Sequence, residues 1–270
     1  MRKKAILQID NLLSAAVPEA VRVPVHFWTQ RLSGRCDPMI PRLPSLILRR
    51  GTAIDVGANQ GLYTYALARL SKRVEAFEPQ PWCATRLEAY ANRFQAKVVV
   101  HEVGLSDEEA KMELKVPYFE TALGRTRLTG LASLARSPDD APSETVSVDV
   151  RTLDSYAFQD VTFIKIDVEG YEGNVIDGAS RTISLNRPVV MVEIEQRHLG
   201  ARPIEEVFRK ITAHGYSGGF YFEGKPAPLE EFSYSRHQEA ALDNIEDAVA
   251  HDRYANNFIF WPRELAFVLR

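Results

Sequence analysis

The chain has 270 residues, 45% of them hydrophobic and 26% charged, which is typical of a soluble globular protein large enough for one sizeable domain. Its 33 lysines and arginines against 36 aspartates and glutamates give a net charge of -3. This composition provides no basic footprint, so we expect no nucleic-acid partner. The two cysteines, Cys36 and Cys83, are too few for a disulfide framework and are expected to be free thiols in a reducing cytosol.

The amino-terminal region lacks the features of a membrane signal. Gln8, Asp10 and Asn11 interrupt the apolar run that a signal peptide needs, and no later window approaches the ~20 apolar residues of a membrane span. Apolar residues here recur instead at helical spacing. We expect residues 1–50 to form an accessory or lid segment on a domain of residues 51–270. We also expect a cytoplasmic location without integral membrane association.

Strand-like and helix-like segments alternate from Thr52 onward, which predicts an α/β fold with a mostly parallel sheet. The predicted strands are 52–56, 73–77, 97–101, 112–116, 145–150, 161–166, 188–194 and 258–262. The predicted helices are 62–70, 82–94, 171–184 and 204–214. The polar stretch of residues 117–144 contains several glycines and prolines and is predicted to be a long functional loop.

The turn after the first strand carries the first cofactor signal. Asp55 precedes Gly57, Asn59 and Gly61, between a strand and a helix, which is where nucleotide cofactors bind in such sheets. The two glycines are four residues apart, whereas the dinucleotide pattern places its third glycine five residues after the first. A carboxylate in the loop suits a cationic ligand better than a pyrophosphate, and S-adenosylmethionine is such a ligand.

Two further turns complete the predicted cofactor site. Glu78 follows the second strand, where an acid accepts hydrogen bonds from both ribose hydroxyls of an adenosine group. A solvated glutamate at a strand end is the alternative for this position. Ser106 and Asp107 follow the third strand, and Asp107 is placed to accept from the adenine amine; capping of the following turn is the competing interpretation.

The densest group of acids lies at the end of a central strand. Asp167, Glu169 and Glu172 follow a nearly continuous apolar run, at the sheet edge where ligands bind. Such clustered carboxylates need a cation or solvent, which Lys165 or a cationic cofactor supplies. A hard divalent ion is the alternative, but no spaced set of histidines and carboxylates supports a metal, and we predict none.

The end of the next strand offers residues for the methyl acceptor's side of such a site. Glu195 and His198 lie there, and the reference pKa of histidine suits a general base. We leave the base open among Asp167, Glu169, Glu195 and His198. Arg125, Arg127 and Arg136 in the 117–144 loop are candidates for binding an anionic sugar or phosphate, against the alternative of a solvated loop.

Taken together, these motifs resemble the FkbM-type family of S-adenosylmethionine-dependent methyltransferases. The matching segments include 55–61, 77–79, 104–106, 130–134, 152–155, 164–172 and 257–260, in the expected order. The resemblance implies a Rossmann-like class I methyltransferase fold, with a mostly parallel seven-stranded sheet flanked by helices. It also implies transfer of a methyl group to a hydroxyl oxygen of a sugar, glycan or secondary metabolite. Gly173-Asn174 departs from the family pattern, but on the helix after the site.

Two other functions remain open from the sequence. A nicotinamide-dependent oxidoreductase uses a similar sheet, although it has no use for Asp55 or for the Asp167 and Glu169 pair. A cofactor-binding scaffold without activity is the third possibility. For the methyltransferase, the expected partner is a small-molecule or glycan acceptor, and a homo-oligomer is possible.

Overall fold

The computed structural model describes residues 17–121, 124–134, 142–265 and 269. Its main sheet has eight strands in the order β11-β10-β12-β9-β8-β1-β2-β3. These are β1 (Thr52–Val56), β2 (Arg73–Phe77), β3 (Val98–His101), β8 (Val161–Ile166), β9 (Val189–Glu193), β10 (Tyr216–Phe222), β11 (Lys225–Pro228) and β12 (Asn257–Pro262). The strands from β9 to β3 are parallel, whereas β12 is antiparallel to β9 and β10, and β11 to β10. The α/β class is confirmed, with a mixed sheet of eight strands rather than seven.

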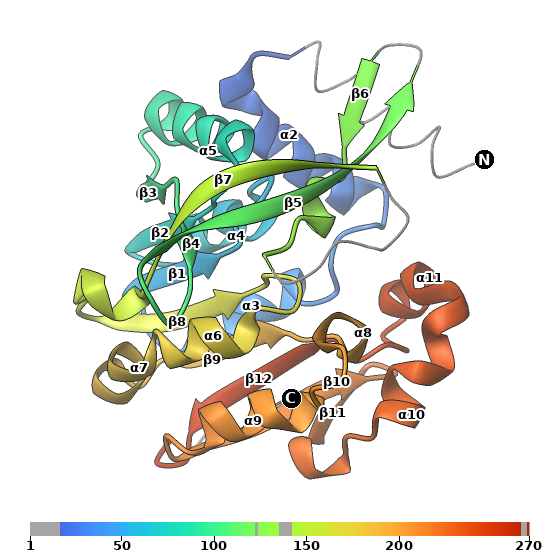
Figure 1. Ribbon diagram of the computed structural model, residues 1–270. Helices are drawn as coiled ribbons and strands as arrows, with labels where there is room; N and C mark the ends of the chain where they lie inside the picture. The colour runs from blue at the N-terminus through green and yellow to red at the C-terminus, as the bar shows by residue number, and fades with distance from the viewer. Residues whose placement is uncertain (1–16, 122–123, 135–141, 266–268, 270) are drawn as a thin grey trace.

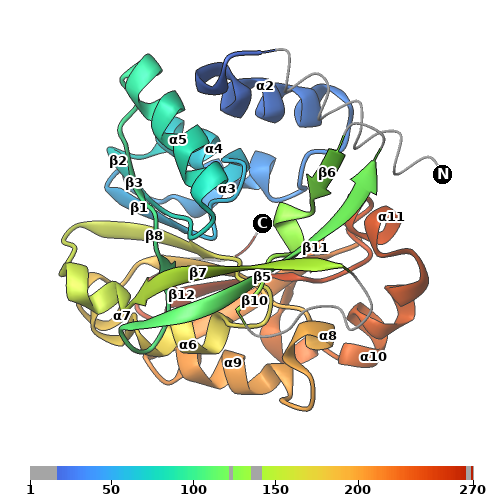
Figure 2. The same cartoon turned by 45° about the horizontal axis from the view of Figure 1, so that its top comes forward.

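Helices cover both faces of this sheet (Figures 1 and 2). Side chains alternate across the strands, so that Ala53 joins the core beneath one layer of helices and Ile54 the core beneath the other. The first layer contains α2 (Glu19–Leu32), α3 (Leu43–Leu46), α4 (Leu62–Leu70) and α5 (Pro81–Phe94). The second contains α6 (Glu172–Asp177), α7 (Ser180–Asn186) and α9 (Ile204–Thr212). The remaining helices are α8 (Gln196–Leu199), α10 (Tyr234–His237), α11 (Ile245–Ala250), η1 (Ile40–Arg42), η3 (Leu153–Tyr156), η4 (Leu229–Glu231) and η5 (Glu239–Asn244).

The order of the strands places a crevice at one edge of the sheet. β1 lies between β2 and β8, and the chain builds outward from β1 in opposite directions. At such a reversal the connections leave to opposite faces, so the carboxyl ends of the two central strands are open to a ligand. Every residue of β8 is buried, as expected for a central strand covered on both faces.

A second, four-stranded sheet lies beside this crevice. It consists of β4 (Gly104–Leu105), β7 (Ser143–Arg151), β5 (Ala110–Thr121) and β6 (Gly124–Arg127), followed by the short helix η2 (Thr129–Leu131). We call this unit the β arm; Figure 1 shows its long strands crossing the front of the domain. The prediction of a loop from residue 117 is therefore wrong for the described part, because β5 continues to Thr121 and pairs with β6.

The helix predicted over 171–184 is broken into α6 and α7. At Gly178 an added Cβ would lie 1.9 Å from the carbonyl oxygen of Ser106, so the chain passes too close to that turn for a continuous helix with a side chain there. Asp154 then accepts hydrogen bonds from the backbone N–H groups of Arg181 and Thr182, which caps the start of α7.

The described part of the amino-terminal segment packs into the domain. Val23 and Phe27 of α2, with Leu43 and Leu46, belong to the same hydrophobic cluster as β1. The predicted helix over residues 6–17 lies almost entirely outside the described residues. A lid role for residues 1–50 stays a prediction.

Candidate active site

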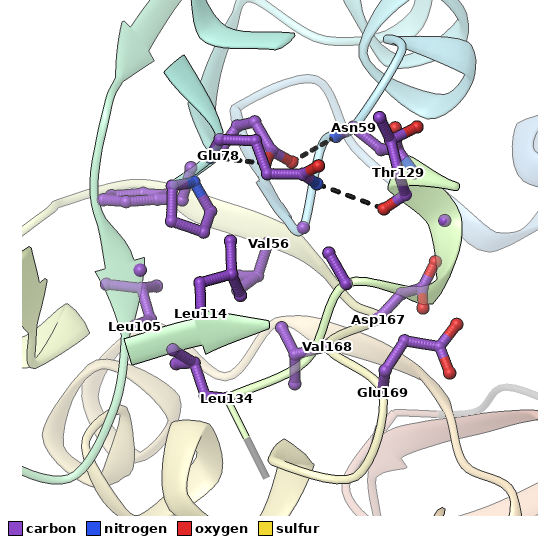
Figure 3. Close-up of a pocket in the computed structure, with 17 residues that line it drawn as sticks. Val56, Asn59, Glu78, Leu105, Leu114, Thr129, Leu134, Asp167, Val168 and Glu169 are labelled. Carbon is purple, nitrogen blue, oxygen red and sulfur yellow. Dashed lines mark hydrogen bonds between the residues drawn. The ribbon is translucent and has the colours of Figure 1, made fainter. Parts of the chain in front are cut away.

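An open cavity of about 620 Å³ lies at the carboxyl ends of β1, β2 and β8. Figure 3 shows that its lining is divided by polarity, with Glu78 and Asn59 at one end and Asp167 and Glu169 at another. The apolar wall between them comes from Leu105, Leu114, Leu134 and Val168. A cavity of this size, with few polar groups on an apolar wall, is typical of a small-molecule site.

The glycine turn holds the two central strands close together. Gly57 has φ +75°, and a Cβ there would lie 1.9 Å from the carbonyl oxygen of Asp167. Asn59 has φ 47°, in the left-handed region that asparagine tolerates. Gly61 instead contacts the protein core, because a Cβ there would meet Leu87 and Val23. Gly57 and Asn59 line the cavity, whereas Gly61 connects the turn to α2 and α5.

Asp55 does not line the cavity, contrary to the expectation of a carboxylate facing the ligand. Its side chain is fully buried, and its Oδ2 accepts a hydrogen bond of 2.6 Å from the hydroxyl of Thr64 on α4. Burial raises the pKa of Asp55. In this structure Asp55 therefore joins β1 to α4 beneath the turn.

Glu78 lies in the cavity with its carboxylate fixed by the backbone. It accepts hydrogen bonds from the N–H groups of Asn59, at 2.6 Å, and Gln80, at 2.9 Å. Only 1% of the residue is exposed, and burial raises its pKa to about 7. A carboxylate has about four lone-pair sites, so two remain for a ligand's hydroxyl groups.

The turn after β3 contributes different residues from those expected. Gly104 and Leu105 line the cavity, whereas Ser106 and Asp107 do not. The hydroxyl of Ser106 and the amide of Asn174 both donate to Oδ1 of Asp107, which lowers the pKa of that carboxyl. Ser106 and Asp107 thus join this turn to α6 in the structure, and their adenine role stays a prediction.

Asp167 is held by a buried lysine. Nζ of Lys165 lies 2.8 Å from Oδ2 of Asp167, and the lysine side chain is 3% exposed. Burial alone would lower the pKa of Lys165, but the charges of Asp167 and Asp55 outweigh it and raise the pKa. Lys165 is therefore a fixed cation that orients Asp167 at the edge of the cavity.

Glu169 and His198 form an ion pair beside Asp167. Nδ1 of His198 lies 2.7 Å from Oε2 of Glu169, which lines the cavity. Glu169 has φ 54°, a strained conformation for a glutamate, and its carbonyl accepts a 2.7 Å hydrogen bond from Ser133 of the β arm. The sequence predicted both residues as candidates, and the fold brings them together across 29 residues of chain.

Glu195 is occupied elsewhere. Its carboxylate lies 2.6 Å from Arg197 and accepts a hydrogen bond of 2.6 Å from the hydroxyl of Tyr254. It is buried, and it does not line the cavity. The structure thus gives Glu195 a role in joining β9 to the chain before β12, rather than the role of a base.

The sequence analysis missed the residues of the β arm that form one side of the cavity. Leu114, Thr129, Gly130 and Ala132 line it, and the side-chain amide of Gln80 donates to the carbonyl of Thr129. Alternating apolar residues in β5 and β7 were the available signal, but the glycines and prolines that follow favoured a loop.

The three arginines proposed for anion binding are not shown to face the cavity. Arg127 pairs with Glu144, and its guanidinium lies 4.1 Å from the centre of the Trp82 ring. Arg125 lies on β6 opposite Glu120 in the hairpin. Arg136 lies outside the described residues.

Two searches over the described residues bear on metal and membrane binding. In these residues no group of three or more histidine, cysteine, aspartate or glutamate side chains is placed to hold a metal ion. None of the described helices is long and apolar enough to cross a membrane.

The strand order and the cavity at the carboxyl ends of β1 and β8 define a Rossmann-like protein of the class I methyltransferase fold. The Methyltransferase FkbM domain matches residues 55–217, so the chain belongs to the FkbM methyltransferase family. No curated protein sequence matches the chain.

Solved structures similar to this chain include three methyltransferases. Methyltransferase FkbM from Methylobacillus flagellatus KT has 19% identity and a TM-score of 0.49, over 80% of this chain and 45% of that one, so this chain spans less than half of its length. Precorrin-6y C5,15-methyltransferase from Geobacter metallireducens GS-15 has 12% identity and a TM-score of 0.42, covering 83% and 86%. An rRNA methylase from Streptococcus thermophilus has 12% identity and a TM-score of 0.42, covering 82% and 90%.

Proposed function

We propose that this protein transfers a methyl group from S-adenosylmethionine to a hydroxyl oxygen of a sugar, glycan or secondary metabolite. Family membership supports methyl transfer. The observation that carries the cofactor is Glu78, a buried carboxylate fixed by two backbone N–H groups with lone pairs directed to a cavity. Glu78 suits the ribose hydroxyls, the apolar wall suits the adenine ring, and Asp167 suits the cationic end.

His198 is the general base that the geometry favours. Of the four candidates, Asp167 is paired with Lys165, and Glu195 with Arg197 and Tyr254. Glu169 binds Nδ1 of His198 and so fixes the tautomer whose Nε2 is free to take a proton from the methyl acceptor's hydroxyl. When bound, S-adenosylmethionine supplies a methyl group on a cationic sulfur, which makes a good leaving group. The β arm beside it would keep water from the reacting oxygen.

Glu78→Gln is expected to weaken the binding of S-adenosylhomocysteine ~10–100-fold. The substitution removes an ionic acceptor, and hydrogen bonds to charged groups contribute ~1.5–3 kcal/mol. Calorimetry measures the change. The matched control is Glu88→Gln, an exposed glutamate on α5, which should leave the affinity unchanged. Equal affinity in both variants would remove Glu78 from the site; binding of NADH in place of S-adenosylhomocysteine would favour an oxidoreductase.

The affinity for S-adenosylhomocysteine is also expected to depend on pH through Glu78. Burial raises the pKa of Glu78 to about 7, so the free protein holds a proton on this carboxyl below that pH. Only the ionised form accepts from two hydroxyls, so binding must release the proton, and affinity should fall by up to ~10-fold for each pH unit below about 7. Calorimetry between pH 5.5 and 8.5 tests this. The slope should be lost in Glu78→Gln; an unchanged slope would assign it to another group.

A further inference from the structure

We propose that the methyl acceptor binds in a second cavity, of about 280 Å³, and that this cavity selects molecules rich in hydroxyl or amine donors and rejects anions. The cavity lies between Asp37–Met39 and Tyr254–Asn257. These two segments lie outside the matched family domain of residues 55–217. The inference rests on the proposed methyl transfer and adds to it the chemical class of the acceptor.

The fold places this cavity next to the acidic edge of the cofactor site. Asn257 begins β12 and pairs with Glu193 at the end of β9, and β9 is the neighbour of β8, which leads to Asp167. The side-chain amide of Asn256 donates a 2.6 Å hydrogen bond to Oε1 of Glu193. A molecule in the second cavity would therefore lie beside the strand ends that carry the reacting groups.

The charges around the cavity favour hydrogen-bond donors over anions. The nearby cations are already paired, Arg42 with Asp252 at 2.5 Å and Lys165 with Asp167 at 2.8 Å. Asp37 and Glu193 accept hydrogen bonds from neutral groups and have no ion-pair partner among the described residues. Burial raises the pKa of both carboxyls, so an arriving anion would find acids and no spare cation.

A buried amide oxygen in the wall of the cavity supports the same choice. Asn257 is 8% exposed, and its Oδ1 has no hydrogen-bond partner among the described residues. Its Nδ2 already donates to Asn256. A buried amide oxygen without a donor costs ~1–3 kcal/mol, which a hydroxyl or amine of the ligand would recover. An anionic group has no hydrogen to offer.

The test compares four sugars of the same ring on protein loaded with S-adenosylhomocysteine. Glucose, glucosamine, glucuronate and glucose 6-phosphate are titrated, and NMR shifts of the protein report each dissociation constant. We expect glucose and glucosamine to bind at millimolar concentrations and the two anions to bind at least tenfold more weakly. Equal or tighter binding of an anion, or no binding of either glucose or glucosamine, would overturn the inference.

Substitutions assign the selection to the cavity. Asp37→Lys should reverse the preference toward the anions, and Asp37→Asn, which preserves the size of the side chain, should weaken glucosamine at least tenfold. Glu108→Gln removes an exposed carboxylate elsewhere and should change neither. An unchanged sugar preference in Asp37→Lys would contradict the inference. Affinity for S-adenosylhomocysteine separates the two levels, because its absence in the unmodified protein would refute the proposed function instead.

Discussion

Replacing Gly57 by alanine is expected to destabilise the protein by about 3 kcal/mol or more, a large part of the ~5–15 kcal/mol that a domain of ordinary stability has. Two effects add. The residue has φ +75°, where a Cβ costs ~1–2 kcal/mol, and that Cβ would lie 1.9 Å from the carbonyl oxygen of Asp167. Because this oxygen is backbone, relief requires β1 and β8 to separate at their carboxyl ends. Urea unfolding followed by circular dichroism measures the loss.

Gly224→Ala is a matched control for this prediction. Gly224 has φ +74°, nearly the same as Gly57, but nothing lies within 4 Å of an added Cβ. Gly224→Ala should therefore show the conformational cost alone, and the difference between the two variants isolates the contact with Asp167. If both variants lose the same stability, the close approach of the two strands is not what requires glycine at position 57.

Residues that meet close in the sequence were the predictable part of the fold. The bounds of β1, α4 and β2 agree with the predicted ranges because each is a short apolar run with a clear break after it. The edge hairpin of β10 and β11 was not predicted. Its turn, Glu223-Gly224, has positive φ at both residues, which matches a type I′ turn, but glutamate is not one of the residues that usually signal it.

The candidate site was predictable as a location rather than as a set of contacts. Strand ends showed where acids gather, and the structure places Glu78, Asp167 and Glu169 around one cavity. Which acids face the ligand depends on distant partners. Asp55 is satisfied by Thr64 on α4, and Glu195 by Tyr254, which lies 59 residues further along the chain. No local pattern reports such pairings.

The β arm shows the same limit for a larger unit. Leu114 and Val148 belong to a small hydrophobic cluster of their own, so β5 and β7 hold together without support from the main sheet alone. Pro117 lies within β5 and weakened the strand pattern, although its place at the end of the ladder, opposite Ser143, removes little hydrogen bonding. The closure of the cavity by this arm follows from tertiary packing.

His198→Gln is expected to lower the rate of methyl transfer ~10²–10⁴-fold, the usual contribution of a positioned general base. Affinity for S-adenosylhomocysteine should stay within about twofold, since His198 does not line the cofactor cavity. The rate is measured with labelled methyl groups on an acceptor found by screening. His251→Gln is the control, because His251 also lies near a carboxylate, at 3.4 Å from Asp247, but is exposed elsewhere on the molecule. A small effect, equal to that of the control, would exclude His198 as the base.

The pH dependence distinguishes a base from a residue that only supports the structure. Burial lowers the pKa of His198, but the hydrogen bond and charge of Glu169 outweigh it, so the pKa is raised above its usual value. A base must be neutral, so the rate should rise with pH as His198 loses its proton. Glu169→Gln removes the charge that stabilises the imidazolium, which should lower the pKa and move the rising limb to lower pH. NMR titration of the His198 ring measures the same shift without any methyl acceptor. An unmoved pKa would mean that the 2.7 Å contact between Glu169 and His198 does not control the protonation of the ring.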